Sequence, residues 1–422
     1  DGALLAIKNY NNTNYGRANV GGGIVYVNDG TYAWVGGSSA YTTAADTWVT
    51  VTRAATSTNR ASVIIGSQSG NSSINGKTKI LDITLSATTN LFFRGDNSAL
   101  WFDQCTINYT GASMIYANGI VTHYTRNTIT AAVQGLSNPS GKTATVGLLR
   151  GNTISSNDAI LVYTAIGNSR GGATAMTTSP GFSTASNAYT DNKIIAFNKW
   201  LKMNTTGAFS IKETIERMAV VQNVFEHTGT TAGFIISLGA DSSVTGDISG
   251  VCMWHNTFIG ERTNFFYNDN STNAPLRTNL SVKNNITDDY NIKSDTFGTP
   301  SGVRVGNWAA LHGVNFSGNL WGDHTNNVGA QGLTNEFSGL HTLSPAYGQV
   351  SSYMGYTSHA AWTGGSAAAG NGDYSLTAAS PAVGMQMDWV LPYDISGIAR
   401  GSTSASGAYH FGATSNFFQF FQ

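Results

Sequence analysis

Two stretches from the middle of the chain, IIAFNKWL (194–201) and VVQNVFEH (220–227), share one pattern: an apolar run, one Asn, and a second apolar run. The pattern returns at YTRNTIT (124–130), LLRGNTIS (148–155), MWHNTFIG (253–260), VKNNITDD (282–289) and FSGNLWGD (316–323). The asparagines are Asn127, Asn152, Asn198, Asn223, Asn256, Asn285 and Asn319, and subtraction gives spacings of 25, 46, 25, 33, 29 and 34 residues. A recurring period of about 20 to 50 residues is the mark of a solenoid.

An Asn between two strands favours a turn, because it hydrogen-bonds nearby backbone and tolerates the left-handed region. If the coils stack, each Asn amide can donate to one neighbour and accept from the other, as in an Asn ladder. Neighbouring coils then bury one another's apolar edges. The pattern therefore predicts an all-β, parallel β-helix with a column of asparagines. The 46-residue gap predicts one coil plus a protruding loop, for which the Gly-, Ser- and Thr-rich segment from Asn168 to Thr190 is the candidate.

Composition agrees with turn-rich β structure and disfavours several classes of protein. Charged residues are 11% of the 422 residues and Gly numbers 49, which argues against long helices. The net charge of −1 argues against general attraction to nucleic acid, and no window reaches the ~18 apolar residues of a membrane span. We predict one domain over 1–422, with an N-terminal cap and first coils in 1–60 and C-terminal coils and a closing tail in 340–422.

The cysteines and the first residues say little about cellular compartment. Cys105 and Cys252 lie in strand-like contexts several coils apart, too far for the ~5.5 Å Cα separation of a disulfide. We therefore expect buried free thiols. The opening DGALLAIKNY lacks the regions of a signal peptide, so an export signal has been cleaved or was never present.

Both ends and the middle repeat resemble pectate-lyase-like β-helix proteins, many of which are secreted or virion-borne. The resemblance rests on the entry GGGIVYVNDGTY (21–32), the Asn repeat, and the exit phrases GDYSLTAASPAVG (372–384), YDISGIARG (393–401) and GAYHFGA (407–413). It implies a single-stranded, right-handed parallel β-helix with three strands per coil. It also implies an extracellular location (secreted, cell-surface or virion-borne) and a substrate cleft along the outer face of the first strands.

The register of the repeat predicts which side chains line that face. If the Asn marks the turn between the second and third strands, the first strands fall at ASMIYA (112–117), DAILVYT (158–164), AFSIKE (208–213), FIISLG (234–239) and NFFYND (264–269). Because strand side chains alternate with period two, the outer face is predicted to carry Tyr116, Tyr163, Lys212, Ser237 and Tyr267.

Charged residues gather in the same part of the chain. Residues 191–295 hold nine Lys or Arg and eleven Asp or Glu, including four of the five Glu of the protein. These charged residues could belong to ordinary turns exposed to solvent, or they could form a functional site. The turns are expected to bring Lys202, His227, Glu261, Arg262 and Asp289 to one edge of the first strands, and Glu213, Glu216, Arg217 and Asp241 to the other.

The segment FSIKETIERMAVVQNVF (209–225) resembles the catalytic coil of alginate and chondroitin lyases, and the resemblance places the base on Lys212. It departs from them where Glu213 replaces the usual Ser. β-Elimination on a uronic-acid glycan needs a group that neutralises the carboxylate, a base and an acid. We predict the following catalytic residues: Lys212 as base, Arg217 or Arg262 for the carboxylate, and His227 or Tyr267 as acid. Predicted substrate-binding residues are Tyr163, Lys202, Glu226, Trp254 and Glu261.

Several alternatives stay open. Ca²⁺ could neutralise the carboxylate through Glu213, Glu216 or Asp241, since hard cations choose oxygen ligands. A glycoside hydrolase needs two carboxyl groups about 5 to 9.5 Å apart, for which Glu213 with Asp241, or Glu226 with Glu261, are candidates. A glycan-binding tailspike or adhesin needs neither a Ca²⁺ site nor a pair of carboxyl groups. Such a protein would be a homotrimer, and a monomer is the alternative. Trp200 and Trp254 could line a groove, but core packing explains them equally well.

Overall fold

A computed structural model of the chain divides it into two compact units, residues 1–170 (unit 1) and 171–422 (unit 2), and each is described by itself. The residues that the structure describes are 6, 10, 13–14, 22–33, 48–66, 70–73, 77–87, 91–94, 99–109, 121–131, 145–156, 160–170, 182–183, 193–203, 207–211, 216–227, 234–238, 248–259, 264–268, 277–287, 297–298, 314–321, 355–358, 372–384, 390–400 and 406–411.

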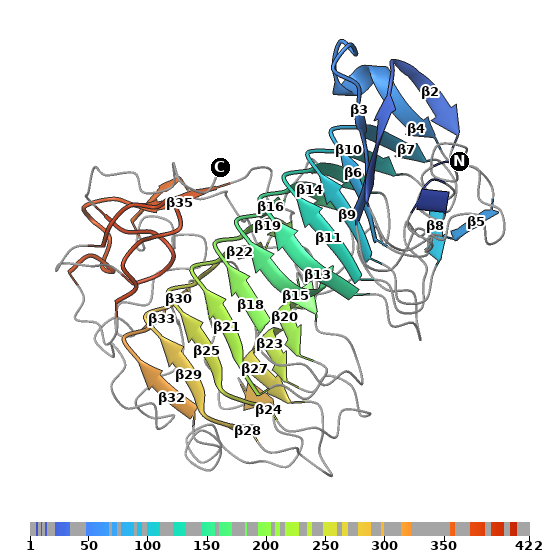
Figure 1. Cartoon of the computed structure of the whole chain (residues 1–422). Coiled ribbons are helices and arrows are strands. Elements are labelled where there is room, and N and C mark those ends of the chain that lie inside the picture. The colour runs from blue at the N-terminus through green and yellow to red at the C-terminus, as the bar shows by residue number, and fades with distance from the viewer. Residues whose placement is uncertain are drawn as a thin grey trace. The chain divides into compact units, whose positions relative to one another are not determined.

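Unit 1 is built from two stacks of parallel strands, which Figure 1 shows in blue to green. Sheet A contains β1 (Gly23–Val27), β3 (Trp48–Arg53), β6 (Lys77–Leu81), β9 (Ala99–Asp103), β11 (Val121–Thr125), β13 (Thr145–Arg150) and β15 (Ile160–Ile166). Sheet B contains β2 (Gly30–Ala33), β4 (Val63–Gly66), β7 (Thr84–Ala87), β10 (Thr106–Tyr109), β12 (Thr128–Ala131), β14 (Thr153–Ser156) and β16 (Ser169–Arg170). A short 3₁₀ turn, η1 (Arg60–Ser62), and the pair β5 (Gly70–Ser73) and β8 (Leu91–Arg94) complete it.

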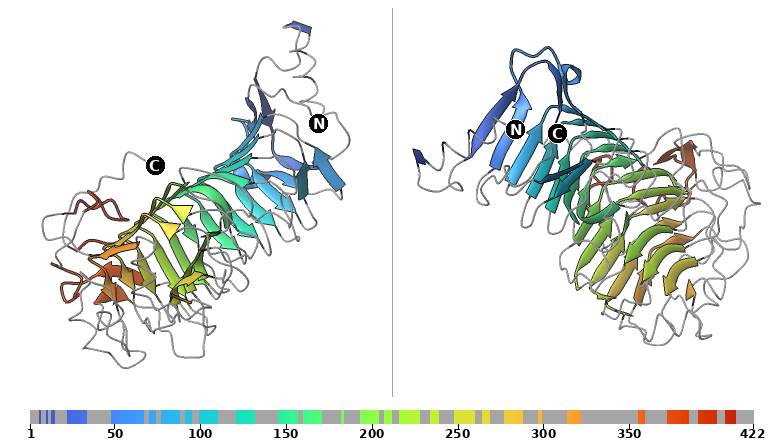
Figure 2. Two further views of the ribbon diagram at one scale, coloured as in Figure 1. Left: turned by 90° about the horizontal axis from the view of Figure 1, so that it is seen from below. Right: turned by 90° about the vertical axis from the view of Figure 1, so that its right-hand side faces the viewer.

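Unit 2, whose strands Figure 2 shows in green to orange, has two parallel stacks of the same kind and a further set of parallel strands, which we call sheet C. Its sheet A contains β18 (Lys193–Ala196), β21 (Met218–Val221), β25 (Val251–Trp254), β29 (Leu280–Lys283) and β32 (Val314–Ser317). Its sheet B contains β19 (Lys199–Met203), β22 (Val224–His227), β26 (Thr257–Ile259), β30 (Ile286–Thr287) and β33 (Leu320–Trp321). Sheet C contains β17 (Phe182–Ser183), β20 (Gly207–Ile211), β23 (Phe234–Leu238), β27 (Asn264–Asn268) and β31 (Phe297–Gly298). Two short strands, β24 (Ile248–Ser249) and β28 (Arg277–Thr278), also pair. The predicted parallel β-helix is confirmed.

The Asn ladder is present in both units. In unit 2, the backbone N–H and side-chain Nδ2 of Asn223 both donate to Oδ1 of Asn256, at 3.0 and 2.9 Å. Asn256 donates to Asn285 in the same way, and its Nδ2 also donates to the Val220 carbonyl at 2.8 Å. Equivalent bonds join Asn198 to Asn223 and Asn285 to Asn319, and in unit 1 Asn127 to Asn152. Each side-chain amide of this buried column is thus hydrogen-bonded to a neighbouring amide in the stack.

The ladder of unit 1 contains one more Asn than the spacing predicts. Asn152 donates to Oδ1 of Asn168 at 2.7 Å, so Asn168 is a ladder residue only 16 residues on. The prediction that the loop begins at Asn168 is therefore wrong. The strand that precedes it, β15, pairs with β13 in sheet A, so the prediction of a separate first strand at 158–164 is also wrong. The coil is short because β14 is followed almost directly by the strand that leads into the next Asn.

The left-handed residue of each turn lies one position before the ladder residue. Ten such residues have φ between 54° and 68°: Asp82, Gln104, Arg126, Gly151 and Gly167 in unit 1, and Phe197, Gln222, His255, Asn284 and Gly318 in unit 2. The ladder Asn therefore acts through its amide bonds, and its own tolerance of the left-handed region is not what makes the turn. Toward the N-terminus, Cys105 and then Ile83 take the ladder position. The Cys105 thiol donates to the Ile80 carbonyl at 3.3 Å, the place that an Asn Nδ2 takes in the other rungs.

Alternating apolar residues fill the interior of each stack. In unit 1, Phe102 stacks on Tyr124 with ring centroids 5.2 Å apart, and in unit 2 Phe225 stacks on Phe258 at 5.3 Å. Trp200, next to Phe225 in register, is fully buried, so core packing explains it. Both cysteines are free, as predicted; Cys105 is buried and Cys252 is half-buried. Burial raises the pKa of Cys105 to about 11, so this thiol is inert.

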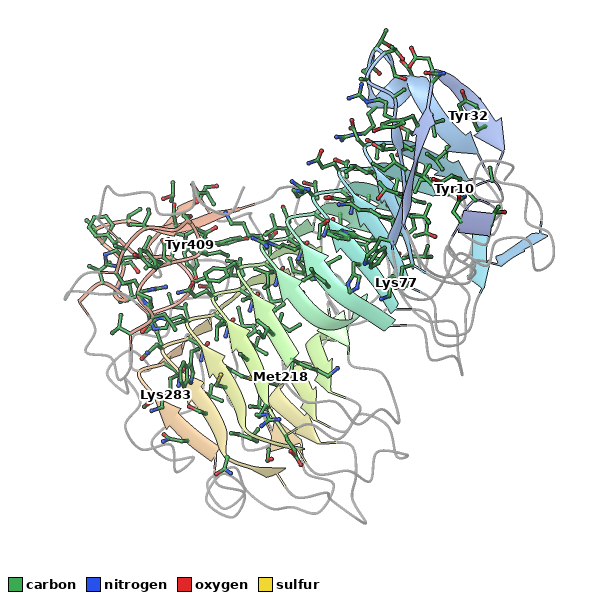
Figure 3. All side chains as sticks on the ribbon, viewed as in Figure 1. Tyr10, Tyr32, Lys77, Met218, Lys283 and Tyr409 are labelled. Atoms are coloured by element: carbon green, nitrogen blue, oxygen red, sulfur yellow. The ribbon has the colours of Figure 1, made fainter. Side chains whose placement is uncertain are left out.

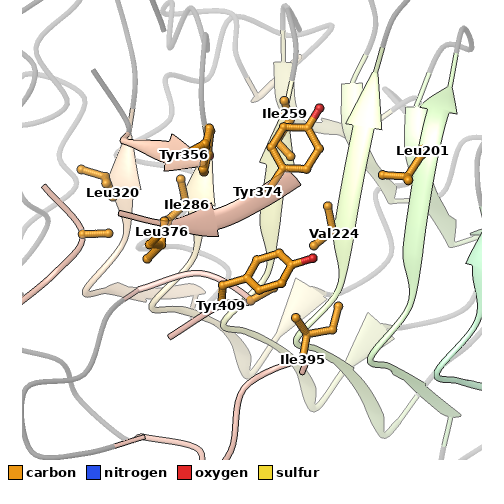
Figure 4. Packing of buried hydrophobic residues seen from close by; sticks show 12 residues of the cluster. Leu201, Val224, Ile259, Ile286, Leu320, Tyr356, Tyr374, Leu376, Ile395 and Tyr409 are labelled. Carbon is orange, nitrogen blue, oxygen red and sulfur yellow. The ribbon is translucent and has the colours of Figure 1, made fainter. Parts of the chain in front are cut away.

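Segments near the C-terminus cover the outer face of sheet B in unit 2. Where C-terminal coils were expected, β34 (Tyr356–Ser358) and β35 (Asp373–Leu376) pair antiparallel. Tyr374 and Tyr409 pack against Val224 and its apolar neighbours on sheet B (Figure 4). This explains why outward positions such as Ile286 and Leu320 are apolar, whereas the equivalent Thr128 and Thr153 of unit 1 are exposed.

The predicted exit phrases supply the contacts that hold these segments. Buried Asp394 accepts hydrogen bonds from the backbone N–H groups of Ser396, Ile398 and His410. Buried Arg400 donates to the carbonyl of Gly407 at 2.7 Å, and Gly407 N–H donates to the Asn284 carbonyl of the turn below it. The phrases thus close the stack by fastening the segment to the ladder turns.

Candidate functional site

The predicted catalytic strands form sheet C of unit 2. Strands β20, β23 and β27 lie where the sequence predicts first strands, and they pair in parallel. In this register Ser210 lies opposite Ser237, and Ser237 lies opposite Tyr267. Lys212 is two positions past Ser210 and lies outside the described residues, as does the predicted first strand at 112–117 with Tyr116. The structure therefore brings the strands together but does not test the role of Lys212.

The other predicted site residues that the structure describes are spread over several elements of both units. Glu216 and Arg217 are exposed just before β21. Backbone positions alone are described for His227, which ends β22 opposite Met203, and for Lys202 in β19. Tyr163 belongs to β15 of unit 1. The remaining residues lie outside the described part of the chain: Glu213, Asp241, Glu261, Arg262 and Asp289.

Glu226 is placed differently from the prediction of an open groove. It lies on β22 beneath the C-terminal segments, with 1% of its surface exposed. The backbone N–H of Gly372 approaches its Oε2 at 3.5 Å. In this arrangement the carboxyl is covered by the protein's own chain, because the outer face of sheet B is used for packing.

Trp254 lies half-exposed at the end of β25, on the outer face of sheet A in unit 2. Its indole N–H donates to the Ser281 hydroxyl at 2.9 Å. The next strand places Lys283 opposite it in register. The ring is therefore held at the surface of sheet A with Lys283 at the neighbouring register position, and its role in substrate binding stays a prediction.

A second aromatic surface, on the outer face of sheet A in unit 1, was not predicted from the sequence. We call it the tryptophan face: Trp48, Lys77, Lys79, Trp101 and His123, all half-buried. Trp48 packs edge-on against Trp101, with ring centroids 5.8 Å apart at 73°, and lies 6.5 Å from the His123 ring. The Lys79 ammonium stands 3.8 Å from the centre of the Trp101 ring, a cation–π contact.

Hydrogen bonds fix the tryptophan face from below. The Trp101 indole N–H donates to the Thr125 hydroxyl at 2.7 Å, and that hydroxyl donates to Asp103 at 2.8 Å. Asp103, 1% exposed, also pairs with Lys79 at 2.9 Å and with Arg126 at 2.6 Å. Burial alone would raise the pKa of Asp103, but hydrogen bonds from Arg126, Lys79 and Thr125 outweigh it and hold the pKa below its ordinary value. The carboxylate therefore stays ionised and orients the face.

His123 is the titratable group at the far end of the tryptophan face. Burial lowers its pKa below the ordinary value, so it is neutral at pH 7. Its Nδ1 is buried and has no hydrogen-bond partner among the described residues. His123 therefore serves as an uncharged ring beside Trp48.

A signal for this face was present in the sequence. The strands WVTVTR (48–53), KTKIL (77–81), ALWFD (99–103) and VTHYT (121–125) alternate buried residues with outward ones. The outward positions of these strands include Trp, Lys and His, whereas the outward positions that follow the ladder in sheet B of unit 1 carry Thr106, Thr128 and Thr153. The first three of these strands are not followed by a ladder Asn, so the Asn repeat does not give their register.

Comparison with known proteins gives no match: no family model, no curated protein and no solved structure is similar enough to this chain. Within the described residues, no group of three or more His, Cys, Asp or Glu is placed to hold a metal ion. The described part of the chain also contains no helix long and apolar enough to cross a membrane.

Proposed function

We propose that the protein binds an extracellular polysaccharide along its solenoid and cleaves it by β-elimination next to a uronic acid. The fold is compatible with carbohydrate-active and tailspike-like proteins. The observation that supports substrate binding best is Trp254, held half-exposed by Ser281 beside Lys283. An aromatic ring offers an apolar platform to a sugar ring, and an adjacent ammonium attracts a sugar carboxylate.

The proposed chemistry is assigned to sheet C, whose strands run in register through Ser237 and Tyr267. Lys212 takes the proton next to the uronate carboxylate, and Tyr267 or His227 protonates the leaving oxygen. Arg217, exposed before β21, or Arg262 neutralises the carboxylate. Carbon–oxygen cleavage then leaves an unsaturated sugar and a new free end, with no net oxidation.

A metal could take over part of this role. Ca²⁺ would bind the uronate carboxylate through oxygen ligands such as Glu213, Glu216 or Asp241. Of these three residues the structure describes Glu216, which is exposed. Loss of activity on chelation, restored by Ca²⁺ alone, would support this arrangement over a purely cationic one.

The test is a panel of acidic and neutral polysaccharides, followed by ultraviolet absorbance of unsaturated sugars and by reducing ends. Both signals together support the lyase, reducing ends alone indicate hydrolysis, and binding without either indicates an adhesin. Lys212→Ala should abolish turnover with the circular dichroism spectrum unchanged. Lys212→Arg separates a base from a mere positive charge, because Arg keeps the charge and cannot lose its proton. Full turnover in the Arg variant would contradict the base role. Mass in solution distinguishes a monomer from the trimer of a spike.

A further inference from the structure

We propose that the tryptophan face of unit 1 is a separate binding site for an acidic glycan, one that bears carboxylate or sulfate groups. It lies on sheet A of unit 1, whereas the proposed catalytic residues Lys212, His227 and Tyr267 belong to unit 2. The inference concerns binding alone and stands whether or not sheet C is catalytic.

The first argument is that two large aromatic rings are held partly open to solvent in fixed positions. Trp101 is fixed by Thr125 at its N–H, by Lys79 over its ring and by Trp48 at its edge. A ring that is already ordered loses little conformational freedom when a ligand packs on it, which favours binding. Packing in the core alone would not require the chain of bonds that ends at buried Asp103.

The second argument is charge. Between residues 48 and 150, the side chains that the structure describes include six Lys or Arg and only two carboxylates. The cations are Arg53, Arg60, Lys77, Lys79, Arg126 and Arg150, and the carboxylates are Asp82 and Asp103. Each carboxylate is contacted by two cations. The surplus of about four positive charges contrasts with the net charge of −1 of the whole chain and favours an anionic ligand.

The third argument is where the charges are exposed. Asp103 is 1% exposed, so it does not repel an approaching anion directly, while the Arg126 side chain is 51% exposed. Lys77, which is labelled in Figure 3, lies in β6 opposite Trp48 in the register of sheet A, so an ammonium and an indole occupy neighbouring positions of the same outer face. A sugar ring on the indole would place its carboxylate or sulfate within reach of Lys77.

A single-stranded nucleic acid also combines stacking with negative charge, and the observations favour a glycan. The outward rows next to the two tryptophans hold Thr50 and Thr52, whose hydroxyls suit the hydroxyl groups of a sugar. The face also carries only a few positive charges, fewer than a groove that follows a phosphate backbone requires.

The test is a titration of tryptophan fluorescence with four polymers: polygalacturonate, chondroitin sulfate, dextran and single-stranded oligothymidine. Tight binding of one or both acidic glycans, weakened by salt, is expected, and the preferred one identifies the anion. Dextran or oligothymidine binding as tightly as both acidic glycans would overturn the proposal.

Variants locate the site. Lys77→Met should weaken binding of the acidic glycan about threefold to tenfold, and Trp48→Leu by at least about tenfold, as for aromatic residues at the centre of an interface. The matched control is Thr128→Glu, an exposed residue on sheet B of unit 1 that changes the net charge by the same one unit. If Trp48→Leu fails to fold, Lys77→Met decides. Unchanged affinity in that folded variant, or an equal loss in Thr128→Glu, refutes the site. Lys212→Ala should leave this affinity unchanged, which separates it from the proposed lyase.

Discussion

Asn256 offers the most direct test of what stabilises this fold, through the substitution Asn256→Ala. Its Oδ1 accepts from the backbone and side-chain N–H groups of Asn223, at 3.0 and 2.9 Å. Its Nδ2 donates to Val220 at 2.8 Å and to Asn285 at 3.0 Å. The side chain is fully buried, so water cannot replace these partners in the folded state. Four hydrogen bonds are lost at once.

The expected cost follows from these four bonds. A net contribution of about 1 kcal/mol for each gives about 4 kcal/mol, and groups left buried without a partner can add to this. Such a loss is a large share of the 5–15 kcal/mol of a typical domain. Asn256→Asp, which keeps the shape, should also destabilise, because a carboxylate cannot donate to Val220 and Asn285 and its charge would be buried.

The assay is urea unfolding of each variant, together with hydrogen exchange of peptides that cover β21 and β25. A solenoid can unfold in parts, so exchange reports the local loss when the global transition is not two-state. Asn28→Ala, in an exposed turn of unit 1, is the control and should change stability by about 0.5 kcal/mol or less. A loss under about 1 kcal/mol for Asn256→Ala, similar to this control, would refute the view that the ladder stabilises the stack.

Three further predictions concern single residues. Gly407→Ala should release the C-terminal segment, seen as faster proteolysis there, because φ is +84° and a Cβ would lie 2.6 Å from Ile286 and 2.7 Å from Thr257; unchanged proteolysis would contradict the docking. Asp103→Asn should lower the free energy of unfolding by about 3 kcal/mol at pH 7. Because the pKa of Asp103 is lowered in the folded protein, the difference in stability between wild type and variant should shrink as pH falls below about 4. A difference that stays constant when unfolding is measured as a function of pH would argue against the ion pairs. Cys105→Asn should extend the amide column and raise the melting temperature, since an amide bonds more strongly than a thiol; a lower melting temperature would mean that the Cys site cannot hold the larger side chain.

Much of the fold could be predicted from the sequence because Asn in this position has a narrow physical role. Asn127, Asn198 and Asn256 each stand between two apolar runs, and a buried amide needs the same partners in every rung. Asn168 was missed because the residues after it, Ser169 and Arg170, are polar, so the second apolar run of the pattern is absent there.

The covering of sheet B could also be anticipated from the residue after three of the ladder asparagines of unit 2. Thr128 and Thr153 follow their Asn in unit 1 and are exposed, whereas Val224, Ile286 and Leu320 do so in unit 2 and are buried. An outward apolar column needs a cover, and the exit phrases provide it. This also explains why Glu226, which follows the same alternation, is not open to solvent.

The site was harder to predict than the fold. The charged residues of a segment can be read from the sequence. Their positions in space cannot, because they do not recur from coil to coil as the ladder Asn does. Lys212 and Arg262 lie outside the described residues, so their roles stay predictions. The tryptophan face was missed because Trp48 and Trp101 occur before the Asn repeat begins, and because they are far in sequence from each other and from His123.

The donors of the amide column all run one way, from each Asn to the next Asn along the chain. A duplicated coil inserted between Asn223 and Asn256 would receive the same two bonds that Asn256 now receives and would give the same two onward. Such a duplication leaves no buried amide without its partners, so the length of this protein can change by whole coils during evolution or in engineering. At the N-terminal end of the column, Cys105 and Ile83 occupy the ladder position in place of Asn. A coil inserted there would not find the same amide partners.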